Sequence, residues 1–178
     1  MASTTSFRRA RLSFGYLLRS PARLIAFGFG VGLAPRAPGT LASLAAIPLY
    51  NALAVRMATM DLLLLAGLAF FAGVWACEKT GRDIGMEDHG GMVWDEIVAM
   101  VFILSLLPGT LIAQGIAFGL FRYFDIAKPG PVGYAQLKIR GGLGVMADDL
   151  VAAFLVLVCF TLWKLILGWP SWMTNSTF

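Results

Sequence analysis

The sequence predicts an all-α, polytopic membrane protein made of short helical hairpins and a C-terminal membrane helix, with its polar loops gathered on the cytoplasmic face. Three observations predict this fold class. Hydrophobic residues make up 58% of the 178 residues and charged residues only 13%, against about a quarter in soluble proteins. Long apolar runs recur along the chain, and a pair of acids stands directly before two of them.

The first twenty residues are basic and lack the pattern of a cleaved signal peptide. A basic arm on an anionic leaflet, where each cation contributes about 1 kcal/mol, and a disordered tail both fit residues 1–12. We therefore divide the chain into a basic N-terminal arm, residues 1–23, and a single membrane-embedded domain, residues 24–178. The arginines of the first twenty residues are Arg8, Arg9, Arg11 and Arg19.

Three long apolar runs predict helices at residues 41–55, 62–77 and 150–168. The first two are shorter than the roughly 20 residues that cross a bilayer, so turns at the interface must extend them. A fourth stretch, residues 97–121, is broken by Pro108-Gly109. It fits either one kinked span or two short helices joined by a turn.

The placement of basic residues favours two short helices within residues 97–121. With a cytoplasmic N-terminus and a second hairpin there, all but two of the fourteen Lys and Arg residues lie on the cytoplasmic side or in the arm. This satisfies the positive-inside rule, whereas a single crossing places the basic segment 122–149 outside. Helices of about a dozen residues require local thinning of the bilayer or partial insertion.

Residues 28–44 form a turn rich in glycine and proline before a helix that begins near Thr40 or Ser43. Such a turn can present backbone N–H groups to a phosphate, and Arg36 is its one cation. It lacks the lysine of a P-loop. Thr40 and Arg36 are candidate phosphate contacts, and an ordinary turn is the alternative.

The second polar loop holds His89, the only histidine in the chain, and ends in Asp95 and Glu96. Both acids fall in the first turn of a predicted helix, where the helix dipole stabilises a carboxylate by about 0.3–1 kcal/mol. Helix capping explains one acid more easily than two, since isolated carboxylates at a membrane surface are costly unless they are paired or bound to metal.

The third polar loop repeats this arrangement. Asp125 lies three residues from both Arg122 and Lys128, so it can pair with either cation on a helix face. A glycine-rich turn then leads to Asp148 and Asp149, which we expect to open the last span.

Two acid pairs at two helix starts on one side of the membrane predict a single carboxylate cluster. Hard oxygen ligands without cysteine suit Mg²⁺. Basic residues near the cluster fit a phosphate ester whose tail stays in the bilayer, with the metal polarising phosphoryl oxygens and activating water. The expected ligands are Asp95, Glu96, Asp148 and Asp149, and the expected cations are Arg36, Arg122, Lys128 and Arg140.

Four segments between Gly30 and about Ala153 resemble, in order, the sequence blocks of the phosphatidylglycerophosphatase A family: GVGLAPRAPGTLAS, DHGGMVWDEIVAM, FRYFDIAKPGPV and GGLGVMADDLVA. The resemblance implies a Mg²⁺-dependent phosphatase of the bacterial inner membrane, with residues 24–178 as its phosphatase domain. Its substrate in the bilayer would be phosphatidylglycerophosphate, and its products phosphatidylglycerol and inorganic phosphate. We expect an active site facing the cytoplasm and no nucleic-acid partner, and we make no prediction of oligomeric state.

Carried over residue by residue, the family's acidic positions fall on Asp95, Glu96, Asp125, Asp148 and Asp149, and its basic positions fall on Arg122 and Lys128. Ala42, Ala99 and Ala153 stand where we expect glycine. His89 is a candidate general acid for the leaving glycerol oxygen; orientation of an acid, or a bond to a backbone carbonyl, is the alternative. The expected catalytic residues are Asp95, Glu96, Asp125, Asp149 and His89, and the expected phosphate-binding residues are Arg122, Lys128, Thr40 and Arg36.

Two other functions also fit paired acids at the ends of membrane helices. A CDP-alcohol phosphotransferase also places paired acids at the ends of membrane helices, but its longer DGxxAR…GxxxDxxxD series is absent. A small cation-binding transporter is expected to hold its charges near the bilayer midplane, whereas these acids stand at the ends of the predicted spans.

Overall fold

The computed structural model describes residues 13–170, apart from the side chains of residues 135–137, and this part of the chain is helical without strands. Three arginines of the predicted basic arm, Arg8, Arg9 and Arg11, lie outside the described residues. The elements are α1 (Phe14–Leu17), α2 (Pro21–Ala26), the 3-10 helix η2 (Gly28–Leu33), α3 (Pro38–Ala54), α4 (Thr59–Ile84), α5 (Trp94–Ser105), α6 (Leu111–Ala127), α7 (Pro131–Lys138) and α8 (Gly141–Leu167).

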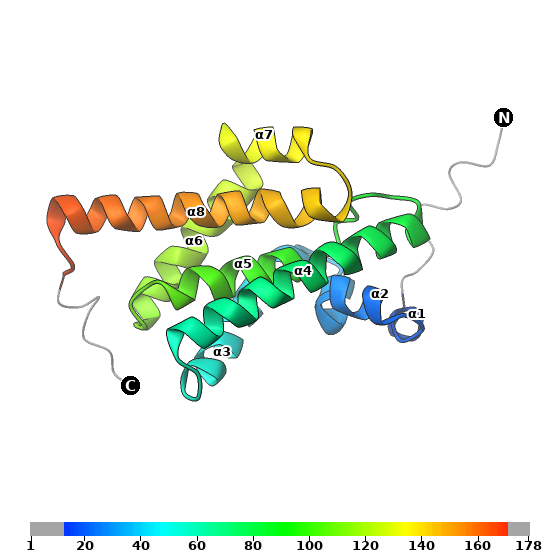
Figure 1. Cartoon of the computed structure of the whole chain (residues 1–178), viewed down its shortest axis with the longest axis horizontal. Coiled ribbons are helices and arrows are strands. Elements are labelled where there is room, and N and C mark those ends of the chain that lie inside the picture. Colours follow the sequence, from blue (N-terminus) through cyan, green and yellow to red (C-terminus); the bar gives the residue numbers. More distant parts are fainter. Residues whose placement is uncertain (1–12, 171–178) are drawn as a thin grey trace.

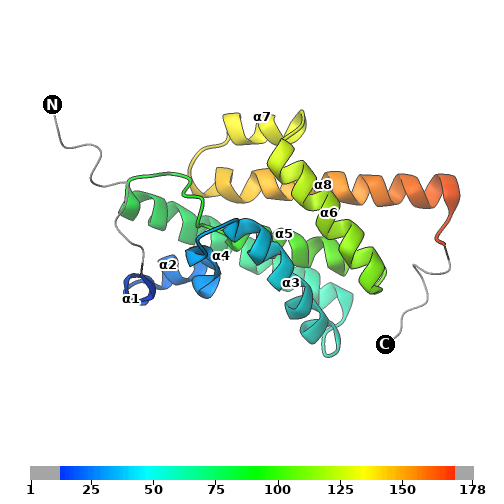
Figure 2. The same cartoon turned by 180° about the vertical axis from the view of Figure 1, so that it is seen from behind.

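The two longest helices, α4 and α8, run antiparallel, and the short helix α5 packs against both of them and against α3 (Figure 1). Nine of the twelve residues of α5 are buried, so α5 is the centre of the bundle. Helix α2 packs beside the C-terminal half of α4, and α7 lies along the start of α8. Seen from behind, α6 crosses α8 on the side away from α4 (Figure 2).

Helices α4 and α8 are long and apolar enough to cross a membrane. Only 28% of the apolar window of α4 and 22% of that of α8 are buried in the structure, whereas a core helix of a soluble protein is mostly buried. Large side chains such as Leu68, Phe71 and Ile166 are at least 70% exposed. This exposed apolar surface favours a membrane environment for both helices, as the sequence predicts.

The predicted helices are present with shifted ends. Pro108-Gly109 separates α5 from α6, as the two-helix interpretation of this stretch requires. Thr110 caps α6 by accepting the backbone N–H of Ala113 at 3.3 Å. The prediction that Asp148 and Asp149 open the last helix is wrong, because α8 begins at Gly141.

Close packing explains the early start of α8. Gly142 is buried in its first turn, where a Cβ would clash with the backbone oxygen of Val74 on α4. Glu78 of α4 accepts the backbone N–H of Gly142 at 2.7 Å and so caps α8 from a neighbouring helix. The glycines expected to form a flexible turn therefore form the contact that joins α8 to α4.

A buried amide pair joins α3 to α6. Gln114 is 2% exposed, and its amide exchanges two hydrogen bonds with the amide of Asn51, at 2.7 and 3.2 Å. Hydrogen bonds between membrane helices contribute about 1–2 kcal/mol in model peptides and less on average in whole proteins. This pair fixes the position of α3 along the axis of α6.

Gln114→Leu is expected to lower the free energy of unfolding by about 1–2 kcal/mol, because the Asn51 amide loses its partner in an apolar environment. Thermal unfolding in detergent measures the change. The double variant Asn51→Leu/Gln114→Leu should recover part of the loss. A double variant as unstable as the sum of the single ones contradicts coupling between the two amides.

Candidate active site

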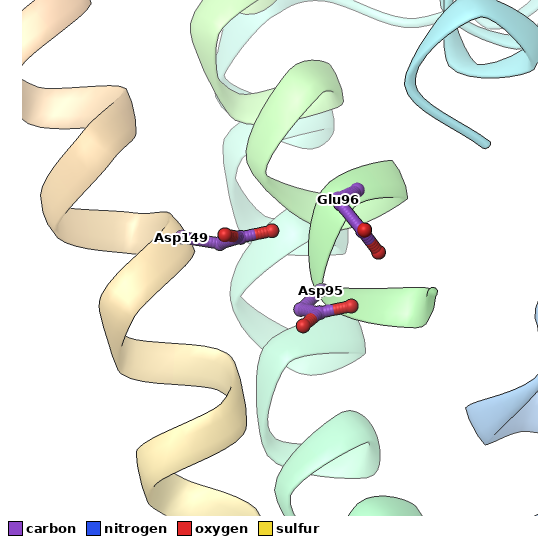
Figure 3. Close-up of side chains that lie close together, drawn as sticks. All are labelled: Asp95, Glu96 and Asp149. Atoms are coloured by element: carbon purple, nitrogen blue, oxygen red, sulfur yellow. The ribbon is translucent and has the colours of Figure 1, made fainter. Parts of the chain in front are cut away.

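Three carboxylates from two helices meet inside the bundle (Figure 3). Asp95 and Glu96 lie in the first turn of α5, and Asp149 lies opposite them on α8. One oxygen from each side chain lies within 4.8 Å of the other two. Asp95 and Asp149 are buried, and the Glu96 side chain is only 13% exposed. We call these three residues the carboxylate triad.

Each member of the triad has a buried oxygen, Asp95 Oδ1, Glu96 Oε2 and Asp149 Oδ2, to which no N–H or O–H group of a described residue donates. Asp95 lies outside the two candidate membrane spans. Burial raises its pKa well above the ordinary value, and the charges of Glu96 and Asp149 raise it further. Buried carboxylates this close repel one another unless one takes up a proton or a cation lies between them. An all-oxygen donor set of this kind fits Mg²⁺.

Arg122 links three helices beside the triad. Its Nη1 lies 2.7 Å from Asp125 Oδ2 on α6 and 3.7 Å from Glu96 Oε1 on α5. The same nitrogen donates to Ser43 Oγ on α3 at 3.4 Å. Arg122 Nε is buried without a hydrogen-bond acceptor among the described residues, so its N–H can serve a further anionic group.

The N-terminus of α3 reaches the triad at Gly39. A Cβ on this residue would collide with Glu96 Oε1 and lie 3.3 Å from Arg122 Nη1. Helix α3 follows Ala37, whose backbone is left-handed, with φ 46° and ψ 53°. The free backbone N–H groups of the first turn therefore lie next to the Glu96–Arg122 pair, where they favour an anion.

Lys128 binds Asp148 rather than the triad. Its Nζ forms an ion pair with Asp148 and lies 3.9 Å from Asp125 Oδ1. Burial lowers the pKa of Lys128, but the hydrogen bond to Asp148 and its negative charge outweigh burial, so the pKa is raised. Lys128 is consequently charged at neutral pH, and it holds positive charge at the C-terminus of α6.

Of the four acids expected in one cluster, Asp95, Glu96 and Asp149 lie together, whereas Asp148 pairs with Lys128; the role of these acids as metal ligands stays a prediction. Successive residues of an α-helix point about 100° apart. When Asp149 faces Asp95 and Glu96, Asp148 must turn toward α6, where Lys128 meets it. The predicted contacts of Asp125 with both cations are present.

The remaining predicted residues lie outside the triad. Arg36 is exposed in the turn before α3, and Thr40 is half-buried in the first turn of that helix. His89 is half-buried; its Nδ1 accepts the backbone N–H of Gly91 at 3.0 Å, and its ring centroid is 5.6 Å from that of Phe27. This bond differs from the expected bond to a backbone carbonyl, because the imidazole accepts a hydrogen instead of donating one. A catalytic role for His89 stays a prediction.

Sequence reasoning gave no site role to Ser43 or to Glu78. Ser43 is fully buried, donates to Gly39 O at 2.9 Å and receives Arg122. The spacing of Gly39 and Ser43, which places both on one helix face, is the signal that could have found Ser43. No local pattern links Glu78 to Gly142, because 64 residues separate them.

Known proteins resemble this chain over most of its length. A family model described as phosphatidylglycerophosphatase A matches residues 24–164. A Haemophilus influenzae relative named phosphatidylglycerophosphatase A is 43% identical over 148 residues, which cover 82% of this chain and 90% of the relative. An Escherichia coli relative of the same name is 40% identical over 138 residues, with 76% and 78% covered.

A third relative, from Bacteroides thetaiotaomicron, is provisionally named a phosphatidylinositol-3-phosphatase. It is 36% identical over 156 residues, which cover 82% of this chain and 94% of the relative. No solved structure matches the chain. The family model and the two relatives that share its name establish that the chain belongs to the phosphatidylglycerophosphatase A family.

Proposed function

We propose that this enzyme removes the terminal phosphate of phosphatidylglycerophosphate in the bilayer, giving phosphatidylglycerol and inorganic phosphate. One observation carries the proposal: three carboxylates with buried, unpaired oxygens lie beside Arg122 inside a bundle of apolar helices, and Lys128 pairs with the neighbouring acid Asp148. Acids that can hold a divalent cation and bases that can bind phosphate are what hydrolysis of a phosphate monoester requires. Membership of the phosphatidylglycerophosphatase A family indicates that the phosphate belongs to the headgroup of phosphatidylglycerophosphate.

We assign Asp95, Glu96 and Asp149 as the residues that hold Mg²⁺. Bound there, the ion supplies positive charge that polarises a phosphoryl oxygen and acidifies water. Arg122 keeps Glu96 in place and offers its Nε–H to a phosphate oxygen, while Asp125 orients both Arg122 and Lys128. The first turn of α3 adds backbone N–H groups at the same point.

Hydrolysis breaks the bond between phosphorus and the glycerol oxygen and adds the oxygen of water to phosphorus. The leaving glycerol oxygen needs a proton. We propose His89 as its donor, since His89 belongs to the loop that leads into the triad and an imidazole N–H can serve as a general acid. Orientation of a triad acid by His89 is the second role compatible with its place in the loop.

We further propose a multi-pass protein of the bacterial inner membrane with its active site at the cytoplasmic face. The loop before α5 and the start of α8 lie at one end of the bundle, and the turns before α4 and α6 lie toward the other (Figure 1). The triad acid Asp149 precedes eighteen residues of α8, about 27 Å of helix, so the acids lie near one end of the span. That position does not fit a transporter site at the midplane.

Wild-type protein in detergent is expected to release inorganic phosphate from phosphatidylglycerophosphate when Mg²⁺ is present and to stop when the ion is chelated. Asp149→Asn should reduce this rate by about 100-fold or more, since even outer partners of metal ligands are worth 10–100-fold. Full activity in Asp149→Asn contradicts the ligand assignment. Release from phosphatidylinositol 3-phosphate alone contradicts the proposed substrate.

The adjacent acids Asp148 and Asp149 should respond differently to Mg²⁺ in thermal unfolding. At a Mg²⁺ concentration of about 100 times Kd, binding stabilises the wild type by about 2.7 kcal/mol, or roughly 5–10 °C. Asp149→Asn should lose this shift. Asp148→Asn should keep it, because Asp148 pairs with Lys128 and not with the triad. An equal loss of the Mg²⁺-induced stabilisation in both variants would show that Asp148 also binds the ion.

Gly39→Ala should reduce kcat/KM by about 10-fold or more, because the added methyl group pushes Glu96 and Arg122 apart. Gly67→Ala is the matched control, since a Cβ on Gly67 of α4 meets nothing within 4 Å. Equal activity of the two variants would show that the approach of α3 to Glu96 does not matter for turnover.

Single cysteines should report the topology when whole cells are labelled with a reagent that cannot cross the membrane. Ala58→Cys and Gly109→Cys are expected to react from the periplasm, and Gly90→Cys and Tyr134→Cys only after the cells are opened. At Gly90 and Gly109 a Cβ meets nothing within 4 Å, so neither change should disturb the fold. Labelling of Gly90→Cys and Tyr134→Cys from opposite sides contradicts the proposed orientation.

A further inference from the structure

An apolar groove of about 590 Å³ lies between η2, α3, α4 and α5. Every residue that lines it is apolar, among them Phe29, Leu49, Leu65, Trp94 and Val101. Small-molecule sites commonly enclose about 300–1,000 Å³. No acidic residue lines the groove, so the groove itself does not hold a cation.

The groove starts at the turn of α5 that carries the triad acids. Trp94 and Ile97 line it, and they flank Asp95 and Glu96 in the sequence. From Trp94 it follows α5 to Val101, about 10 Å farther along the helix. A lipid whose phosphate lies at the acids could therefore place its apolar tail in this groove.

Small side chains create the space, and exposed apolar ones open it to the bilayer. Ala46 and Ala66, on α3 and α4, are buried and leave room between the two helices. At the rim, Phe29 and Leu68 are 59% and 70% exposed. The Trp94 indole N–H donates to Ala69 O at 2.9 Å, which fixes the end of the groove nearest the acids.

We propose that this groove binds one acyl chain of the glycerophospholipid whose headgroup is hydrolysed, while the second chain stays in the bilayer. The inference rests on the proposed function, because the headgroup at the triad determines which lipid reaches the groove. It assigns part of the substrate affinity to apolar contacts that a deacylated headgroup cannot make. Each buried methylene group contributes about 0.8 kcal/mol.

A bulky side chain in the groove should weaken binding of the lipid and leave the headgroup unaffected. Ala45→Phe, at an exposed position that lines the groove, should raise KM about 10-fold for long-chain phosphatidylglycerophosphate, the loss expected for about two methylene groups. KM for the water-soluble deacylated headgroup should not change. Ala52→Phe, exposed on the same helix but outside the groove, should match the wild type with both substrates.

Photolabelling tests the groove without turnover, so its result stands even if the enzyme hydrolyses neither substrate. A phosphatidylglycerophosphate with a diazirine on one acyl chain should label α3 and α5 at the groove, and unlabelled substrate should compete. A phosphatidylcholine probe that labels the groove equally well would make the occupant bulk lipid and overturn the proposal. A disulfide-linked dimer of Leu68→Cys formed in membranes would assign the groove to a second copy and also overturn it.

Discussion

The packing of α5 against α8 holds Asp95, Glu96 and Asp149 close together, although each has an oxygen that no described donor satisfies. Desolvated carboxylates at this separation oppose the fold, so the surrounding helices must supply compensation. Arg122 supplies one positive charge to Glu96, and the first turn of α3 approaches the same oxygen through Gly39. The remaining negative charge is what a divalent cation would neutralise.

The basic residues divide the acids into two groups. Lys128 neutralises Asp148 and approaches Asp125, while Arg122 connects Asp125 to Glu96. Asp125 thus contacts both cations: Arg122, which pairs with the triad, and Lys128, which lies outside it. A phosphate bound between Arg122 and Lys128 would remain close to the triad and, along α5, close to the start of the apolar groove. The chemistry and the binding of the lipid tail would then depend on the same turn of α5.

Much of this arrangement could be predicted from the sequence. The adjacent acids before an apolar run, the break at Pro108-Gly109 and the spacing of Asp125 from its two cations are local patterns, and the structure contains each of them. The start of α8 could not be predicted, because it depends on contacts of Gly142 with Val74 and Glu78, far away in the sequence. The separation of Asp148 from Asp149 follows from the rotation of α8, which becomes known only when its neighbours are in place.

Anomalous diffraction from crystals grown with Mn²⁺, which accepts the same oxygen ligands as Mg²⁺, would locate the ion directly. We expect an anomalous peak bonded to oxygens of Asp95, Glu96 and Asp149, with Asp148 still paired to Lys128. A peak bonded to Asp148 but not to Asp149, or a basic side chain lying between the three carboxylates in place of the ion, would contradict this expectation.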